Sequence, residues 1–248
     1  MLAIIGGTGL TKLANLEMSH HKVIRTPYGE PSGALTFGKL HGRDVIFLAR
    51  HGYGHTIPPH QVNYRANIWA LHTQYVTHVV SVASVGGIRS DLTPGIIAIP
   101  DQIIDYTHGR KSTFFDGPEK PVTHIDFTWP YCEELRQRLI KAAEKAKQKV
   151  VAGGVYGASQ GPRLESAAEI SRLERDGADM VGMTGMPEAA LARELGVCYA
   201  TIAVVANYAA GKGSSKREIH FENLEAAMQK SLDRVKTILE KLVETDGG

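Results

Sequence analysis

Residues 2–9 read Leu-Ala-Ile-Ile-Gly-Gly-Thr-Gly, a short apolar run that stops at a glycine-rich turn. A run of this length bounded by glycine is typical of a buried strand. Similar runs recur along the chain, at residues 35–40, 44–49, 77–83, 96–100, 150–156 and 197–206. Segments with helical spacing lie between most of them. This alternation predicts an α/β fold with a central mixed β-sheet flanked by helices.

The predicted helices have apolar residues three or four positions apart. They cover residues 61–75, 133–148, 166–176, 187–195 and 221–243. Residues 106–131 fit no regular element, and loops of such length are usually functional or lie at interfaces. No linker rich in Pro, Ser or Gly divides the chain, so we expect a single domain over residues 1–248.

Composition excludes several classes of protein. The chain has 28 Lys+Arg against 26 Asp+Glu, and this balance argues against a nucleic-acid binder. Its apolar runs are too short to cross a membrane, and no signal peptide follows Met1. The two cysteines, Cys132 and Cys198, are isolated and form neither a disulfide framework nor a zinc pattern. We therefore expect a reduced, cytoplasmic protein with no nucleic-acid or membrane partner.

The glycine turn after the first strand is one candidate for anion binding. Its backbone N–H groups and the hydroxyl of Thr8 suit an anion, although a plain tight turn explains the glycines equally well. A dinucleotide-binding fingerprint would need a third glycine where Lys12 stands. A dinucleotide-binding oxidoreductase is therefore a weaker alternative, as is a non-catalytic nucleotide sensor.

Arg50 and His51 follow the strand at residues 44–49. A guanidinium matches the oxygens of phosphate, and an imidazole can donate a further hydrogen bond. The alternative is an arginine that covers the end of the sheet with a solvated tip. Open α/β sheets bind ligands at the carboxyl ends of strands, which favours a binding role. His51, His55 and His60 lack a helical metal motif and a nearby carboxylate, so we expect no metal site.

Other strand ends also carry small or polar groups. Ser84 precedes two glycines, and Thr184 lies just ahead of a predicted helix. Met183 could face a sugar, although filling the core is the commoner role of methionine. Asn207 ends an apolar strand, where its amide is costly to bury without partners, or it forms a turn. Together these groups predict a pocket for an anion and a polar, planar ligand.

Five longer motifs resemble those of trimeric purine nucleoside phosphorylases, and more narrowly the methylthioadenosine/methylthioinosine phosphorylase branch. The motifs are Ile-Gly-Gly-Thr-Gly-Leu, Ala-Arg-His-Gly, Pro-Pro-His-Gln-Val-Asn-Tyr-Arg-Ala-Asn-Ile-Trp-Ala-Leu, Gln-Gly-Pro-Arg-Leu-Glu and Gly-Met-Thr-Gly-Met-Pro-Glu-Ala, and the resemblance runs from Ile4 to about Val243. It implies a nucleoside phosphorylase fold. It also implies cleavage of a purine nucleoside by inorganic phosphate, as co-substrate, without metal or organic cofactor.

The resemblance also implies roles for individual residues. Those assigned to phosphate are Thr8, Arg50, His51 and Thr184, with Ser84 beside them. Met183 would pack on the ribose, His55 would lie near phosphate and sugar, and Asn207 would face the purine and stabilise its departure. Phe115 and His124 resemble residues that enter the neighbouring subunit's pocket, which implies a homotrimer. Relatives often have Asn or Thr where this chain has Ala83, so a side-chain contact to phosphate is lost there.

Two positions predict the base preference. Adenine-specific relatives carry Asp-x-Asp where this chain has Asn207-Tyr208-Ala209, and Ser where it has Glu165. An amide can donate to N7 or O6 of a 6-oxopurine, and a carboxylate can accept its N1–H. We therefore expect 6-oxopurine nucleosides as substrates, with an adenine-specific methylthioadenosine phosphorylase as the alternative. If Phe221 rather than His220 lines the pocket for the 5′ substituent of the nucleoside, we expect methylthioinosine to be favoured over inosine or guanosine.

Overall fold

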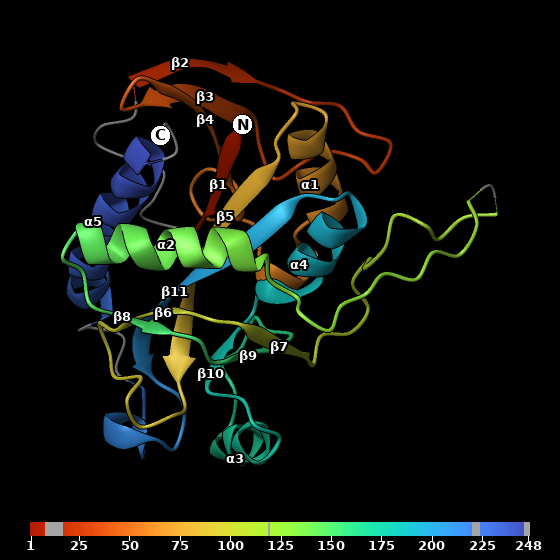
Figure 1. Ribbon diagram of the computed structural model, residues 1–248. Coiled ribbons are helices and arrows are strands. Elements are labelled where there is room, and N and C mark those ends of the chain that lie inside the picture. The colour runs from red at the N-terminus through yellow and green to blue at the C-terminus, as the bar shows by residue number, and fades with distance from the viewer. Residues whose placement is uncertain (8–16, 119, 220–223, 246–248) are drawn as a thin grey trace.

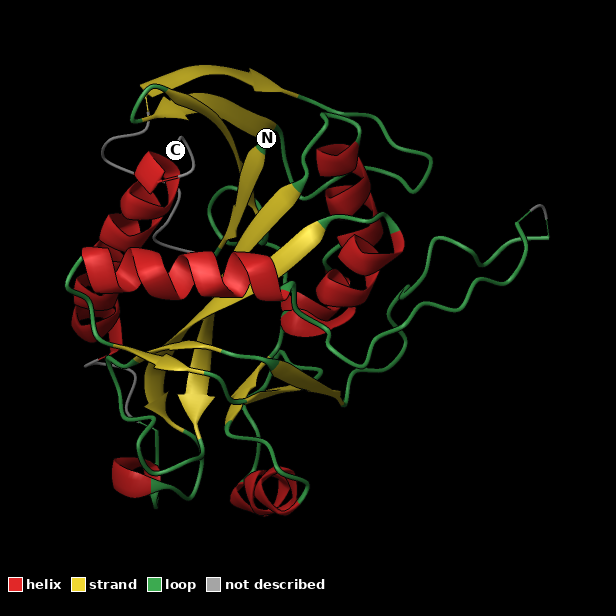
Figure 2. Cartoon of the chain, in the orientation of Figure 1, coloured by secondary structure: helices red, strands yellow, loops and turns green. Residues whose placement is uncertain are grey.

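An 11-stranded mixed sheet runs through the described part of the computed structural model, which is residues 1–7, 17–118, 120–219 and 224–245. The strands are β1 (Leu2–Gly6), β2 (Glu17–Lys22), β3 (Leu35–Leu40), β4 (Arg43–Ala49), β5 (His78–Gly87), β6 (Ile97–Ile99), β7 (Gln102–Asp105), β8 (Val150–Ala152), β9 (Val155–Ala158), β10 (Met180–Gly182) and β11 (Cys198–Tyr208). The helices are α1 (Tyr64–His72), α2 (Glu133–Lys145), α3 (Ala167–Arg175), α4 (Gly185–Glu194) and α5 (Leu224–Thr245). The predicted α/β class with a mixed central sheet is confirmed (Figure 2).

The order of the strands brings several carboxyl ends to one edge. The main path is β2-β3-β4-β1-β5-β10-β9-β7, and β11 joins β5 to β6, which pairs with β8. The pairs β4–β1, β1–β5 and β5–β11 are all parallel. β4 ends at Ala49, level with the middle of β5, and β5 and β11 continue side by side beyond that point to Gly87 and Tyr208. The carboxyl-terminal parts of these strands therefore border one region, where open α/β sheets bind ligands.

Helices cover both faces of the sheet. In β1, Ala3 and Ile5 pack in the cluster that includes α1 and α4, whereas Leu2 and Ile4 pack in the cluster that includes α2 and α5. Alternate side chains of a strand point to opposite faces, so both faces of β1 are buried. Figure 1 shows the two pairs of helices on opposite sides of the central strands.

Several elements differ from the sequence prediction, and they include β7 and β10, which the sequence does not predict. The strand predicted at residues 150–156 is divided, because Gly153 and Gly154 adopt positive φ angles of 108° and 121° that interrupt it. β2 was not predicted, since its side chains are all exposed and show no apolar alternation. α1 begins at Tyr64 instead of residue 61, because the side chain of Asn63 caps the helix by accepting from the N–H of Ala66.

The described residues of segment 106–131 contain no helix or strand. The segment joins β7 to α2 and extends away from the rest of the molecule in Figure 1. Among the helices that the structure describes, none is both long and apolar enough to cross a bilayer.

Candidate active site

A cavity of about 540 Å³ lies where β4, β5 and β11 end. It is also lined by residues just before α3, by the loop from β10 to α4, and by α5. Among its lining residues are nine that the sequence singles out: Arg50, His51, His55, Ser84, Glu165, Met183, Thr184, Asn207 and Ala209. Segments far apart in the chain thus converge on one cavity.

Four other predicted site residues are not among the described residues that line this cavity, two of them because the structure does not describe them. Thr8 and Phe221 lie outside the described residues, although Gly7 and Ile219 belong to the lining. Phe115 packs partly buried against the core, and His124 is exposed in segment 106–131. Their predicted contact is with a neighbouring subunit, and it stays a prediction.

Arg50 is held by a dense set of hydrogen bonds and is 1% exposed. Its Nε and Nη2 donate to the two carboxylate oxygens of Glu188, each at 2.8 Å. Nη2 also donates to the hydroxyl of Ser81, and Nη1 donates to the carbonyl of Val82. A guanidinium has five N–H hydrogens, so these bonds leave one hydrogen on Nη1 for a ligand. Arg50 thus offers a fixed donor rather than a mobile, solvated charge.

Glu188, which the sequence analysis did not assign to the site, completes this arrangement. Its side chain is 0% exposed and also accepts a hydrogen bond from the hydroxyl of Tyr199 at 2.8 Å. Burial alone would lower the pKa of Arg50, but the charge and hydrogen bonds of Glu188 outweigh burial and raise it. A glutamate among apolar residues at the start of α4 is a pattern that could have indicated a buried partner.

His51 is oriented by the backbone. Its Nδ1 lies 2.9 Å from the carbonyl oxygen of Ile57, which can only accept, so Nδ1 carries the proton. Burial and the nearby charge of Arg50 lower the pKa of His51 to about 4. The ring is therefore neutral at pH 7, and Nε2 is an acceptor. In this state His51 offers an acceptor that suits a P–OH group of phosphate, and its role as a phosphate ligand stays a prediction.

The lowered pKa of His51 predicts a pH dependence of stability. Between pH 6.5 and 4 the unfolded chain binds a proton at His51 that the folded protein does not. We expect the free energy of unfolding to fall as the pH decreases through this range. Urea denaturation at a series of pH values measures it. His51→Asn keeps a donor for Ile57 and should give a shallower decrease; equal slopes for both proteins would contradict the assignment.

The loop from β10 to α4 is wrapped around a buried tyrosine. The N–H of Thr184 donates to the hydroxyl of Tyr156 at 3.3 Å. A Cβ at Gly182 would lie 2.1 Å from that hydroxyl oxygen, and one at Gly185 would lie 2.9 Å from the ring. Only glycine fits at these two positions. They place Met183 and Thr184 at the cavity wall.

Asn207 and Glu165 lie at the wall of the same cavity. The pairing of β11 with β5 shifts register between Val205 and Asn207, and such a bulge changes the direction of the following side chain. The amide of Asn207 donates to the carbonyl of Tyr208 at 2.6 Å, which leaves a second N–H and the carbonyl oxygen for a ligand. Glu165 accepts a hydrogen bond from Ser159. The pair therefore offers a donor and an acceptor to a planar ligand.

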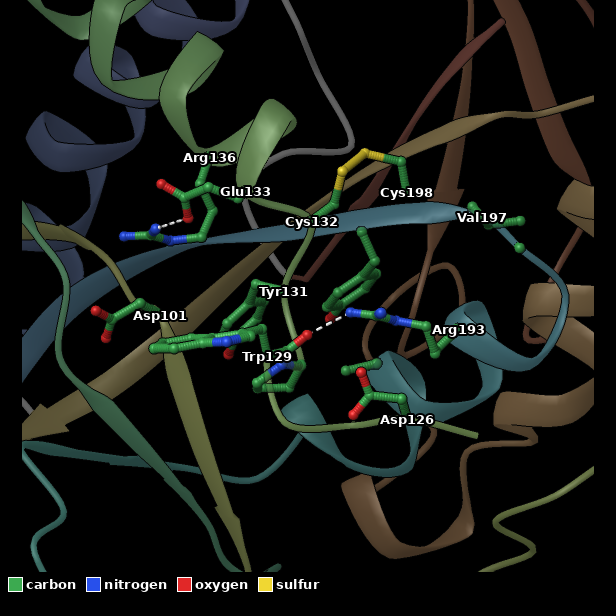
Figure 3. Close-up of a pocket in the computed structure, with 14 residues that line it drawn as sticks. Asp101, Asp126, Trp129, Tyr131, Cys132, Glu133, Arg136, Arg193, Val197 and Cys198 are labelled. Atoms are coloured by element: carbon green, nitrogen blue, oxygen red, sulfur yellow. Dashed lines mark hydrogen bonds and ion pairs between the residues drawn. A yellow bond between two sulfur atoms is a disulfide. The ribbon is translucent and has the colours of Figure 1, made fainter. Parts of the chain in front are cut away.

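The two cysteines form a disulfide, with 5.2 Å between their Cα atoms. The expectation of a reduced protein is therefore wrong, and a separation of 66 residues explains why the sequence did not indicate the bond. Disulfides are rare in the cytosol, and the cytoplasmic location stays a prediction. Figure 3 shows it beside a second cavity, of about 760 Å³, lined by Trp129, Arg136 and Arg193 among others. None of the predicted site residues that the structure describes lines that cavity. The described residues include no cluster of His, Cys, Asp or Glu suited to a metal ion.

Comparison with known proteins agrees with this geometry. Residues 1–244 match the family model described as "Phosphorylase superfamily". The chain is 50% identical to the "Probable S-methyl-5'-thioinosine phosphorylase" of Pseudomonas syringae pv. tomato, over 97% of each chain. It is 55% identical to the protein of the same name from Xanthomonas campestris pv. campestris, over 87% of this chain and 86% of the relative. A "6-oxopurine nucleoside phosphorylase" of Pyrococcus furiosus is 47% identical, over 96% of this chain and 90% of the relative.

Among solved structures, methylthioadenosine phosphorylase from Schistosoma mansoni in complex with adenine superposes with a TM-score of 0.93 and 33% identity. The match covers 99% of this chain and 91% of that one. The fold and the cavity at the strand ends thus define a protein of the nucleoside phosphorylase class. The chain belongs to the phosphorylase superfamily, and the resemblance found in the sequence is confirmed.

Proposed function

We propose that this protein catalyses the phosphorolysis of 6-oxopurine nucleosides, with S-methyl-5′-thioinosine as its principal substrate, in purine salvage. The products are the free base and a sugar 1-phosphate. The observation that carries this proposal is the convergence of Arg50 and Thr184 with Asn207 and Glu165 on one cavity. The first pair suits phosphate, and the second suits a purine with an oxygen at C6.

The chemistry follows from these groups. The C1′–N9 bond breaks through an oxocarbenium-like state, as in glycoside hydrolysis. Phosphate held beneath the sugar stabilises that cation and forms the new C1′–O bond, so no cofactor is needed. Asn207 donates to N7 and stabilises the negative charge that develops on the departing purine. Arg50, His51, Thr184, Ser84 and Thr8 hold the phosphate, and Met183 and His55 face the sugar.

The 5′ end of the substrate favours the methylthio compound. Ile219, Met228 and Leu232 add apolar surface to the cavity. A methylthio group buries well against such side chains, and Gln229 is the polar residue beside them in the cavity lining. We further propose a homotrimer in which Phe115 and His124 reach the neighbouring subunit's cavity, consistent with the extension of segment 106–131 in Figure 1.

A second candidate is an adenine-specific methylthioadenosine phosphorylase, favoured by the similarity to the Schistosoma mansoni enzyme. Glu165 argues against it, because its carboxylate would face N1 of adenine, which carries no proton. The curated relatives named for methylthioinosine or 6-oxopurine nucleosides are also more similar in sequence, at 45–55% identity.

The proposal is tested by offering methylthioinosine, inosine, guanosine and methylthioadenosine, each with and without phosphate, and measuring base release. We expect phosphate-dependent release of hypoxanthine, fastest from methylthioinosine. Faster turnover of methylthioadenosine would favour the second candidate. Release that does not need phosphate would exclude phosphorolysis.

A further inference from the structure

The guanidinium of Arg110 stands where two neighbouring strands leave the sheet. β9 and β10 pair in parallel up to Ala158 and Gly182, and one further bond joins Ser159 N–H to the carbonyl of Gly182. Beyond that point the two chains separate into different loops. Their next carbonyl groups have no strand partner, and buried backbone carbonyls need donors.

Arg110 supplies those donors. Its Nη1 donates to the carbonyls of Met183 and Met186, at 2.8 and 2.6 Å. Its Nη2 donates to the carbonyl of Gln160 at 2.8 Å, and its Nε to the side-chain oxygen of the same residue at 3.2 Å. One side chain from segment 106–131 thus joins the loop after β9 to the loop after β10.

A third segment of the cavity wall is connected through a tyrosine. Nη1 of Arg110 lies 3.2 Å from the hydroxyl of Tyr64, over whose ring the guanidinium also packs. That hydroxyl donates to the carbonyl of Pro59, which lines the cavity. With its hydrogens directed at protein atoms, Arg110 is placed to position the cavity's residues, not to bind substrate itself.

The joined loops carry opposite ends of the site. Met183 and Thr184 lie in one, and Glu165 is hydrogen-bonded to Ser159 in the other. We propose that Arg110 is a positioning residue that fixes the base-reading loop relative to the loop holding ribose and phosphate. This inference rests on the function proposed above. It assigns segment 106–131 a role within its own subunit, in addition to any contact with a neighbour.

The test compares Arg110→Met and Arg110→Lys with Arg65→Met. Arg65 is a matched control because it is also half-buried and binds the same segment, through the carbonyl of Thr113 and the carboxylate of Asp116, yet touches neither loop. Misplacing reacting groups by about 1 Å can cost about 100-fold in rate. We expect kcat/KM for methylthioinosine to fall by about 100-fold in Arg110→Met and by less in Arg110→Lys. Arg65→Met, which loosens only the part of the segment next to Phe115, should lose less activity than Arg110→Met and keep the wild-type preference for methylthioinosine.

Two further readouts separate positioning from general stability. The ratio of kcat/KM for methylthioinosine to kcat/KM for methylthioadenosine should decrease in Arg110→Met, because Glu165 is no longer held in a fixed position. Added guanidinium chloride, at concentrations that leave Tm unchanged, should restore part of the rate of Arg110→Met but not alter wild type. If Arg110→Met does not fold, Arg110→Lys must show the reduced rate and narrowed preference.

The outcomes also separate this inference from the proposed function. A wild-type protein that releases no base from any nucleoside refutes the proposed function and, with it, the role of Arg110. An active wild type with an unchanged rate and preference in Arg110→Met refutes the role of Arg110 alone. If Arg65→Met lost as much kcat/KM and as much preference as Arg110→Met, the role of Arg110 would also be refuted. That result would show that any anchor of segment 106–131 is enough to maintain the site.

Discussion

Replacement of Glu188 by leucine is expected to destabilise the protein by about 3–5 kcal/mol, because it leaves the buried charge of Arg50 without a partner. Urea denaturation at pH 7 measures this change as a lower midpoint. Glu188→Gln should cost less, since an amide of the same shape can still accept one of the two hydrogen bonds. Phosphorolysis should be strongly reduced in both variants.

A double variant separates the two roles of this ion pair. Arg50→Met combined with Glu188→Leu removes both charges, and replacing a buried pair by apolar residues is often neutral or stabilising. We expect stability to return towards wild type while phosphorolysis stays absent, because the donor for phosphate is gone. Glu244→Gln, which breaks the exposed pair with Lys241, should leave the midpoint nearly unchanged. Recovery of activity in the double variant would show that Arg50 does not serve phosphate.

Asn207→Asp is expected to lower kcat/KM for methylthioinosine by about 100- to 1000-fold, the usual cost of losing a donor to a developing negative charge. The carboxylate cannot donate to N7 unless it is protonated, and it repels the charge on the departing base. The same change should raise the rate with methylthioadenosine relative to that with methylthioinosine, because a carboxylate can accept a hydrogen bond from the 6-amino group. Initial rates with both nucleosides at saturating phosphate measure the two effects.

Asn207→Ala is the matched control for this prediction. It removes the amide without adding a charge, so both nucleosides should lose rate. The preference for methylthioinosine should fall less than in Asn207→Asp, because Glu165 remains and no carboxylate is added to accept from the 6-amino group. KM for phosphate should be similar in all three proteins, because the proposed contact of the amide is with the purine and not with phosphate. An unchanged preference in Asn207→Asp would show that Asn207 does not read the base.

The sequence predicts the fold because its pattern is local. The antiparallel pair β3 and β4 and the apolar stripe of α5 each depend on residues that are close in the sequence. β2 lacks such a pattern, since all its side chains are exposed. The division between β8 and β9 depends on the conformation of Gly153 and Gly154, which spacing alone does not reveal.

The site is only partly predictable for a related reason. Arg50, Thr184 and Asn207 stand at strand ends, and strand ends can be located from the sequence. Glu188 lies 138 residues from Arg50, and Arg110 lies 73 residues from Met183, so these contacts exist only after folding. The tautomer of His51 depends on the carbonyl of Ile57, whose position is a property of the loop and not of the motif.

The bond between Cys132 and Cys198 gives the molecule the topology of a closed circle with two tails. α2, β8, β9, α3, β10 and α4 lie inside the circle, together with Glu165, Met183 and Thr184, whereas Arg50, Arg110 and Asn207 belong to the tails. The candidate site is thus assembled between the circle and the tails. One break in the main chain within the circle would leave the polypeptide a single covalent molecule until a reductant opens the bond.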